Sequence, residues 1–308
     1  MTAAQGTDAG GADEHAERFT LLRPLLFTIA YEILGSATEA DDVLQDSYLR
    51  WAEVDLAEVR DTKAYLAQLV TRQALNTLRA QARRREDYIG PWLPEPLLLD
   101  GHHSHDALAD VVLAESVSMA MLVVLETLTP DERAVFVLRE VFGFDHADIA
   151  AAVGKSPAAV RQIAHRAREH VQSRRRRFEP LDRDRSAQIT TEFLSAAASG
   201  DVAALMAVLA PDVAFTSDSN GKVSAARRPV TGAEKVARFI IGLMSRVDSE
   251  YRVEIAQYNS APAVLVYRNE QPDSVFLIEV IDGKITNLYA MRNPEKLVSV
   301  DIPREISR

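Results

Sequence analysis

The chain has 308 residues, which is enough for two or three domains. It contains no cysteine, so disulfides and thiolate-ligated zinc are excluded. The formal net charge is −10, but residues 72–85 carry five arginines and no acid, and residues 161–177 carry seven arginines and one acid. Two concentrated basic tracts in an acidic chain favour contact with nucleic acid over two ordinary solvated helix ends.

Membrane and export signals do not stand out in the sequence. No apolar run approaches the length of a membrane-spanning helix. The N-terminal residues lack the apolar core of a signal peptide. We therefore expect a cytoplasmic protein that does not contact a membrane, with a disordered tail at residues 1–13.

Composition and periodicity divide the rest of the chain into blocks. Residues 14–88 and 113–178 have helical spacing of apolar residues, and a linker with three prolines at 89–112 separates them. After a short linker at 179–185, residues 186–300 begin with helical patterns at 186–199 and 201–209 and then switch to the alternation typical of strands. Asp282-Gly283 predicts a hairpin between two such runs, and residues 301–308 form a C-terminal tail.

The stretch ATEADDVLQDSYLRW, at residues 37–51, has two distinct helical faces. One face suits a core, with Ala40, Leu44, Tyr48 and Trp51 on one line. The other follows an i, i+3, i+4, i+7 pattern with Asp42, Gln45, Asp46 and Leu49. The second face is compatible with an ordinary amphipathic helix or with a surface for a partner protein.

The next helical stretch carries a row of cationic side chains. Its buried side is marked by Leu66, Leu69, Val70 and Leu78. Another side presents Arg72, Asn76, Arg79 and Arg83, a combination that can follow phosphates and read base edges. Tyr65, near the start of the stretch, could stack on an unpaired base or could be a structural tyrosine.

Residues 128–177 have the helix-capping and helix-ending residues typical of a helix-turn-helix. Thr129-Pro130-Asp131-Glu132 reads as a capping box with proline in the first turn. Asp145 can cap a short helix that ends at Gly154, and Ser156 can cap a longer one that begins with Pro157. The longer helix would turn its apolar side toward the domain core, with Val160, Ile163, Ala167 and Val171, while its outer side is basic. The N-terminal part of this longer helix is expected to enter the major groove of DNA.

These motifs, in this order, resemble the extracytoplasmic-function (ECF) sigma factors of bacterial RNA polymerase. EADDVLQDSYLRW resembles their polymerase-binding helix, and AYLAQLVTRQALNTLRAQARRR resembles the adjoining segment that melts and recognises the promoter −10 element. LTPDERAVFVLREVFGFDHADIAAAVGKSPAAVRQIAHRAREHV resembles their region 4, which reads the −35 element. The resemblance implies a region 2 domain at 14–88, a region 4 domain at 113–178, and contact with promoter DNA and core RNA polymerase.

The resemblance also implies roles for individual residues. The clamp region of the largest polymerase subunit would be bound by Asp42, Gln45, Asp46 and Leu49. The −10 element would be bound by Lys63, Tyr65, Arg72, Asn76, Arg79 and Arg83. The −35 element would be bound by Ser156, Arg161, Gln162, His165, Arg166 and Arg168.

The third block is similar to SnoaL-like domains, which have the NTF2-like cone fold. A subgroup of ECF sigma factors, which includes the SigJ-like proteins of actinobacteria, carries this extra domain with a Trp-Leu-Pro-Glu-Pro linker and an Asn-Pro-x-Lys-Leu signature. Both signatures occur here, at 92–96 and 293–297, whereas the subgroup's Asp-Gly-Gly-Gly-Lys loop is replaced by DSNGK at 218–222. The expected fold is therefore two all-α sigma domains followed by an α+β cone.

The resemblance suggests a regulatory contact between this linker and the third block. We expect Trp92, Leu93 and Pro94 to pack on the SnoaL-like domain; the alternative is that the linker packs only on its own sigma domain. The residues assigned to this regulatory contact are Trp92, Leu93, Pro94, Asp218, Lys222, Asn293, Pro294, Lys296 and Leu297. The cone could also hold a small ligand, which the sequence does not identify.

We do not expect the third block to be an enzyme. All seven histidines precede residue 171. The remaining candidates for acid–base chemistry are Asp218, Arg227, Tyr258, Tyr267 and Tyr289, and Asp218 is as compatible with a turn as with a base. No cofactor motif is present, and the histidines of GHHSHD (His102, His103 and His105) fit a flexible segment better than a metal site.

Two other functions are compatible with parts of this pattern. A stand-alone helix-turn-helix regulator would use only residues 113–178, and would leave the stripe at 42–49 without a role. A SnoaL-type isomerase or cyclase with a DNA-binding appendage would need a buried base in the cone. Promoter recognition in complex with RNA polymerase accounts for more of the chain than either alternative.

Overall fold

The computed structural model describes residues 8–99, 111–174, 183–247 and 249–308, without the side chains of residues 8–12, 82–86 and 183–184. It divides into two compact units, which are described separately. The first unit comprises residues 1–84, 124–174 and 305–308, and the second comprises residues 85–123 and 175–304. The predicted domain boundaries differ from this division, because residues 85–88 and 113–123 belong to the second unit and residues 305–308 to the first.

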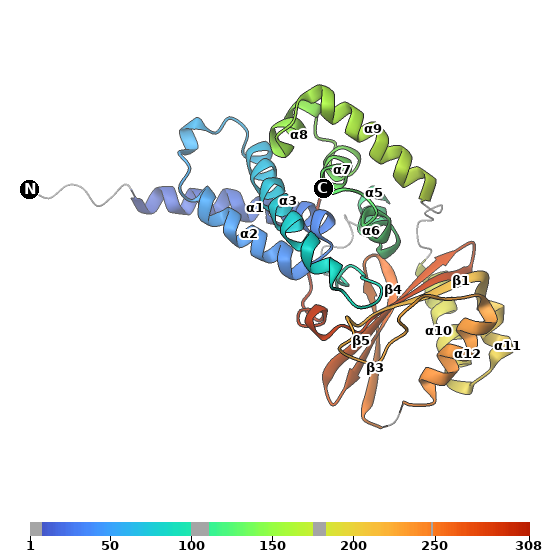
Figure 1. The fold of residues 1–308 in the computed structure, drawn as a ribbon. Coiled ribbons are helices and arrows are strands. Elements are labelled where there is room, and N and C mark those ends of the chain that lie inside the picture. The colour runs from blue at the N-terminus through green and yellow to red at the C-terminus, as the bar shows by residue number, and fades with distance from the viewer. Residues whose placement is uncertain (1–7, 100–110, 175–182, 248) are drawn as a thin grey trace, which may run out of the picture. The chain divides into compact units, whose positions relative to one another are not determined.

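The N-terminal part of the first unit is helical, as expected. It contains α1 (Asp8–Leu34), α2 (Ala37–Trp51), a 3₁₀ turn (Leu56–Glu58) and α3 (Thr62–Glu86) (Figure 1). The hydroxyl of Ser36 accepts a hydrogen bond from the backbone N–H of Glu39 and begins α2. Leu44 and Trp51 on α2 and Leu66 on α3 are fully buried, so the predicted core sides of both helices are confirmed.

The second helical part of this unit begins with α7 (Pro130–Phe136), which continues into a π-helical turn (Val137–Val141). α8 (His146–Val153) and α9 (Pro157–Arg174) follow. The predicted capping box at Thr129 and Glu132 is present, and Asp145 accepts hydrogen bonds from the first turn of α8. Gly154 ends α8 with φ 69°, a conformation that glycine adopts without steric cost. Local sequence therefore determines the helix-turn-helix.

The C-terminal residues also pack in the first unit. Ile306 is 7% exposed, and the backbone N–H of Ser307 donates to Oγ1 of Thr28 at 3.2 Å. Arg133 on α7 is almost fully buried, and its Nε donates to the backbone oxygen of Glu32 on α1 at 2.7 Å. These contacts join segments of the first unit that are far apart in sequence.

The second unit is built on a six-stranded sheet with the order β2-β1-β6-β5-β4-β3. β1 and β6 are parallel, and the other neighbours are antiparallel. The predicted hairpin is confirmed, since Asp282 and Gly283 have φ of 51° and 69° between β5 and β6. The strands are β1 (Leu209–Asp218), β2 (Val230–Thr231), β3 (Tyr251–Tyr258), β4 (Ala261–Arg268), β5 (Gln271–Ile281) and β6 (Lys284–Met291).

Three helices cover one face of this sheet: α10 (Arg183–Ser199), α11 (Val202–Val208) and α12 (Ala233–Met244) (Figure 1). α12 was not predicted, although Val236, Ala237 and Ile240 have helical spacing and are buried. The space between helices and sheet is filled by apolar side chains, and the rings of Phe215 and Phe239 lie 4.9 Å apart.

Residues 87–99 and 111–123 lie against the opposite face of the sheet. The second of these ranges contains α5 (Val111–Ser116) and most of α6 (Met119–Leu125). Leu93 and Met119 join a buried cluster with Tyr258, Leu277 and Tyr289 of the sheet. A short 3₁₀ turn (Pro294–Lys296) follows β6. We call residues 87–99, which lie against this part of the sheet, the docked linker.

None of the helices in the described ranges combines the length and the apolar character that crossing a bilayer requires.

Candidate nucleic-acid interface and linker docking site

The residues assigned to the −10 element lie along α3. Lys63, Tyr65, Arg72, Asn76 and Arg79 are exposed, whereas the side chain of Arg83 lies outside the described residues. Tyr65 is 37% exposed, and its ring centroid lies 5.7 Å from that of Trp51. The Tyr65 ring therefore packs beside Trp51 and is also exposed enough to contact a partner.

Two of these arginines contact the helix-turn-helix part of the same unit. Nη2 of Arg72 donates to the backbone oxygen of Ala151 at 2.7 Å. Nη2 of Arg79 lies 2.6 Å from Oδ1 of Asp131, and Nζ of Lys155 lies 2.8 Å from Oδ2 of the same carboxylate. Partial burial alone would raise the pKa of Asp131, but the hydrogen bonds from Lys155 and Arg79 outweigh it and lower that pKa.

The residues assigned to the −35 element share the outer side of the helix-turn-helix. α9 buries Val160, Ile163 and Ala167. Arg168 is held by a two-pronged contact with Glu140, with N–O distances of 3.1 and 2.6 Å, and Nε2 of His165 lies 3.5 Å from Glu169. The exposed set is Ser156, Arg161, Gln162, His165, Arg166 and Arg168.

The stripe predicted to bind polymerase lies on the surface of α2. Its members Asp42, Gln45, Asp46 and Leu49 are all exposed. Leu49 is 60% exposed. An exposed apolar residue flanked by acids and an amide is compatible with a partner surface.

A buried ion pair lies where the docked linker meets the α+β part. Asp218, at the end of β1, is 0% exposed, and Lys296 is 9% exposed. Nζ of Lys296 lies 2.7 Å from Oδ2 of Asp218 and donates to the backbone oxygen of Leu93 at 2.5 Å. The same Oδ2 accepts the backbone N–H of Leu93 at 2.8 Å. A buried pair of charges thus satisfies the backbone of the linker at Leu93.

Aromatic rings surround the Lys296 ammonium. Its nitrogen lies 3.8 Å from the ring centroid of Trp92 and 5.1 Å from that of Tyr88. Such cation–π contacts stabilise a desolvated ammonium. Leu93 and Pro94 are buried, and Leu297 belongs to the same apolar cluster as Leu93. These contacts are the ones that the expected packing of the linker requires.

Tyr88 is a member of this site that the sequence analysis missed. Its phenol donates to Oδ1 of Asp218 and accepts from Nδ2 of Asn293 at 2.9 Å. Burial raises the pKa of Tyr88 well above its usual range, and the hydrogen bond to Asp218 raises it further. Asn293 also accepts from the backbone N–H of Glu295, so it begins the 3₁₀ turn that starts at Pro294 and presents Lys296.

The DSNGK loop lies close to Ile89 of the linker at Asn220 and Gly221. Asn220 and Gly221 both have positive φ, 47° and 68°, and asparagine is one of the few residues that tolerate this region. Oδ1 of Asn220 accepts the backbone N–H of Ile89 at 3.2 Å. A Cβ on Gly221 would lie 3.1 Å from the Ile89 side chain. Lys222 forms an ion pair with Glu295.

Asn259 is a second residue that the sequence analysis missed. It lies in the tight turn between β3 and β4 with φ 52°. Its side-chain oxygen accepts the backbone N–H of Leu97 at 2.9 Å, and its Nδ2 donates to the backbone oxygen of Val117 at 2.9 Å. One amide therefore holds both the linker and the segment between α5 and α6.

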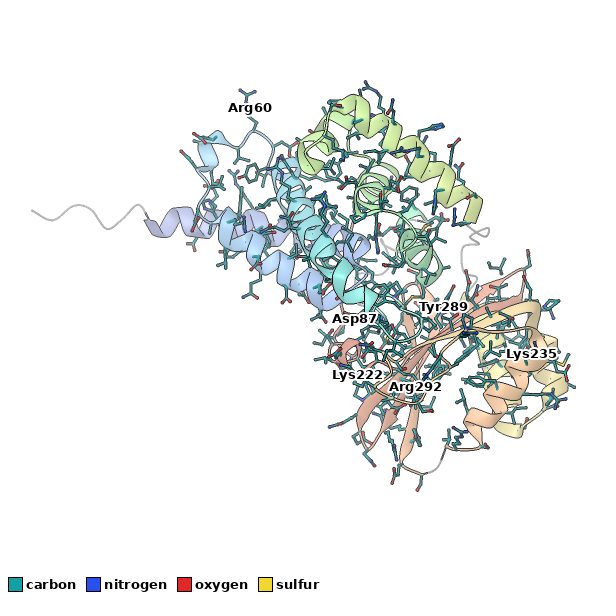
Figure 2. All side chains as sticks on the ribbon, viewed as in Figure 1. Arg60, Asp87, Lys222, Lys235, Tyr289 and Arg292 are labelled. Carbon is teal, nitrogen blue, oxygen red and sulfur yellow. The ribbon has the colours of Figure 1, made fainter. Side chains whose placement is uncertain are left out.

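Of the candidates for acid–base chemistry, the aspartate and the three tyrosines have structural partners in this unit. Asp218 is engaged by Lys296, Tyr88 and Leu93, as described above. The phenol of Tyr258 donates to the backbone oxygen of Val300 at 2.9 Å, and the Arg252 guanidinium lies 3.9 Å from the ring centroid of Tyr267. Tyr289 belongs to the apolar cluster beneath the linker and is labelled, with Lys222 and Arg292, in Figure 2. His102, His103 and His105 lie outside the described residues.

Comparisons with known proteins identify two sigma regions in the chain. The Sigma-70 region 2 model matches residues 19–84, and the Sigma-70 region 4 model matches residues 118–171. The ECF RNA polymerase sigma factor SigJ of Mycobacterium tuberculosis is 38% identical over 288 residues, which cover 90% of this chain and 91% of SigJ. SigI of the same organism, named as a probable ECF RNA polymerase sigma factor, is 30% identical over 285 residues, which cover 89% of this chain and 92% of SigI.

The fold of the chain also matches that of a solved ECF sigma factor. The crystal structure of SigJ from M. tuberculosis aligns with a TM-score of 0.75 at 34% identity, and the alignment covers 93% of this chain and 99% of that one. Both the order of the helical sigma regions and the α+β domain that follows them are therefore confirmed. The chain belongs to the ECF RNA polymerase sigma factors.

Proposed function

We propose that the α+β part of this sigma factor regulates promoter recognition in cis by holding the docked linker. As an alternative sigma factor the chain directs RNA polymerase to promoters. Residues 87–99 lie in the segment that joins its two sigma regions, because the region 2 match ends at residue 84 and the region 4 match begins at residue 118. The observation that carries the proposal is the buried pair of Asp218 and Lys296, which satisfies both backbone groups of Leu93.

A docked linker limits how far its two ends can separate. The two promoter elements lie apart along the DNA, so the two sigma regions must spread to reach them. Undocking would release a stretch of about a dozen residues, each of which spans at most ~3.3–3.6 Å when extended. We therefore assign the docked state to low activity and the undocked state to promoter binding.

The contacts inside the first unit support the same assignment. Arg72 and Arg79 donate to Ala151 and Asp131, so these donors are already engaged with the helix-turn-helix part. DNA phosphates would have to displace these contacts. We propose that the −10 element is bound by Lys63, Tyr65, Arg72, Asn76, Arg79 and Arg83 once the contacts open, and that the −35 element is bound by Ser156, Arg161, Gln162, His165, Arg166 and Arg168.

For the polymerase, we propose that the exposed stripe of Asp42, Gln45, Asp46 and Leu49 binds the clamp region of the largest subunit. This stripe is the feature that a stand-alone helix-turn-helix regulator would not need. The protein would then act in the cytoplasm, where the transcription machinery is. We assign no catalytic step to the α+β part, because the carboxylate of Asp218 is committed to the linker.

Run-off transcription with purified core polymerase tests this proposal. Lys296→Met removes the ammonium that bridges Asp218 and Leu93 and should raise transcription from a cognate promoter severalfold. Lys235→Met is the matched control, since Lys235 is an exposed lysine on α12 of the same unit. Equal rates for Lys296→Met and the wild type would overturn regulation through the docked linker. A lower rate would reverse its sign and make the docked state the active one.

A further inference from the structure

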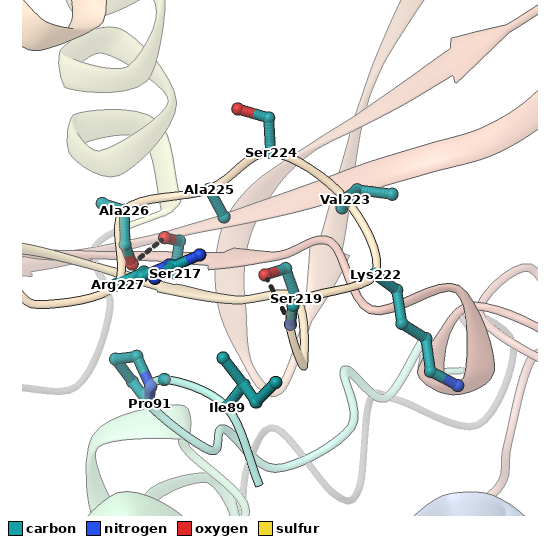
Figure 3. Close-up of a pocket in the computed structure, with 12 residues that line it drawn as sticks. Ile89, Pro91, Ser217, Ser219, Lys222, Val223, Ser224, Ala225, Ala226 and Arg227 are labelled. Atoms are coloured by element: carbon teal, nitrogen blue, oxygen red, sulfur yellow. Dashed lines mark hydrogen bonds between the residues drawn. The ribbon is translucent and has the colours of Figure 1, made fainter.

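A pocket lies between the docked linker and the loop that follows β1. It encloses about 350 Å³, within the range of pockets that hold small ligands, roughly 300–1,000 Å³. Figure 3 shows Ile89 and Pro91 on one side of it, and Val223 and Ala225 on the loop opposite. The pocket is separate from the space beneath α10–α12, where apolar side chains form the core of the unit.

The polar groups of this pocket favour an anion. The residues that line it include Arg227 and the serines 217, 219 and 224 but no acid. Arg227 makes no ion pair with any residue that the structure describes, whereas Lys222 at the rim is paired with Glu295. The Ser219 hydroxyl accepts the backbone N–H of Gly221 at 3.3 Å, which leaves its own proton to donate.

We propose that this pocket binds a small organic anion, namely a carboxylate that carries an apolar body. The guanidinium of Arg227 presents the paired donors that match a carboxylate, and the Ser219 hydroxyl adds a third donor. The body of the ligand would contact apolar side chains on two sides of the pocket, namely Ile89 and Pro91 on one side and Val223 and Ala225 on the other. A neutral compound of the same shape would leave the guanidinium without its anionic partner and bind more weakly.

The position of the pocket gives the ligand a defined effect. Ile89, Gly90 and Pro91 form one wall, so the complete pocket exists only while the linker is docked. The same stretch is held by Asn220, and the neighbouring Leu93 by Asp218. A ligand that binds the docked state alone multiplies the ratio of docked to undocked molecules by one plus its concentration divided by its dissociation constant. The direction of the transcriptional effect rests on the proposed function: the bound carboxylate would hold transcription down.

Isothermal titration calorimetry on the full chain tests the site without polymerase. The probes are acetate, octanoate and 2-naphthoate, with 2-naphthalenemethanol as the neutral analogue of the last. We expect saturable binding of octanoate or 2-naphthoate, and at least tenfold weaker binding of the alcohol. Arg227→Gln should weaken carboxylate binding at least tenfold, whereas Arg228→Gln, a neighbouring arginine that does not line the pocket, should not. Ala225→Trp should fill the pocket and abolish binding.

Two results would overturn the site: no saturable binding of any of the three carboxylates, or binding that Arg227→Gln leaves unchanged. Hydrogen exchange of residues 87–93 provides a second readout and should slow when the carboxylate is bound. Binding with slowed exchange but without a change in run-off transcription would uphold the site and reject cis regulation. A change in transcription with Lys296→Met, without binding of any of the carboxylates, would uphold cis regulation and reject the ligand site.

Discussion

Arg79 and Asp131 form an ion pair with an N–O distance of 2.6 Å, although 52 positions separate them in the sequence. Arg79 lies on α3, within the region 2 match, and Asp131 lies in the first turn of α7, within the region 4 match. The carboxylate also accepts a hydrogen bond from Lys155, so one acid neutralises cations from two elements. In the proposed contact with the −10 element, DNA phosphates would have to displace this pair to reach Arg79.

Neutralising this acid should therefore strengthen binding to −10 DNA. Asp131→Asn should raise the affinity of the full chain for a −10 oligonucleotide severalfold at low salt, and the gain should shrink as salt screens the charges. Asp148→Asn is the control, because it removes the same charge from an exposed position on α8. Fluorescence anisotropy at two ionic strengths measures both variants. Equal gains in the two would show that only net charge matters, and that the Arg79 contact does not.

The buried pair of Asp218 and Lys296 should dominate the stability of the second unit. Lys296→Met leaves the carboxylate buried without its cation, and removing one partner of such a pair costs about 3–5 kcal/mol. The double variant Lys296→Met with Asp218→Asn should recover part of that loss, because no uncompensated charge remains. Urea unfolding, followed by the fluorescence of Trp92 in a Trp51→Phe background, measures each variant. Additive losses would contradict a coupled pair.

Gly221 should be required for the close approach of the linker. Gly221→Ala meets two penalties: a positive φ of 68° and a Cβ only 3.1 Å from the Ile89 side chain. Gly200→Ala is matched to it, with φ 70° but no atom within 4 Å of the added Cβ. We expect both variants to lose about 1 kcal/mol from backbone strain. Only Gly221→Ala should also accelerate hydrogen exchange at Ile89, and equal exchange in the two variants would show that the linker does not depend on this contact.

Tyr88 should stay protonated well above the pH at which a free phenol ionises, about 10. Burial and the Asp218 carboxylate raise its pKa in the folded state. Because the raised pKa favours the protonated form, the stability from Tyr88 is fully present below pH ~10 and is lost as pH rises through the folded-state pKa. Alkaline titration of phenolate absorbance should show late-titrating tyrosines, one fewer in Tyr88→Phe. An unchanged late fraction would place the Tyr88 phenol in water.

Short-range sequence signals accounted for most of the helical sigma regions. The capping box at Thr129, the cap at Asp145 and the glycine stop at Gly154 act within a few residues of themselves. The hairpin at Asp282-Gly283 was predictable for the same reason. The two other tight turns of the sheet, at Asn259-Ser260 and Asn269-Glu270, contain no glycine, and this is why they carried a weaker signal.

The linker docking site could be predicted only in outline. The resemblance assigned Trp92, Lys296 and Asp218 to one contact, but not which atoms meet or which residue is buried. Tyr88 and Asn259 escaped notice because each acts on partners more than a hundred positions away, such as Asp218 and Leu97. A single aromatic or amide residue has no periodicity that could reveal such a partner.

The sequence by itself determined the family, the order of the domains, and the helices whose caps and apolar spacing are encoded locally. Only the tertiary structure decided which charges are paired. The sequence predicted a phosphate contact for Arg79, but in the structure Arg79 pairs with Asp131. For Asp218 the sequence was compatible with a turn residue or a catalytic base, and in the structure its carboxylate accepts the backbone N–H of Leu93. The physical reason is that burial and long-range pairing set the state of a charged group, and both depend on residues brought together by folding.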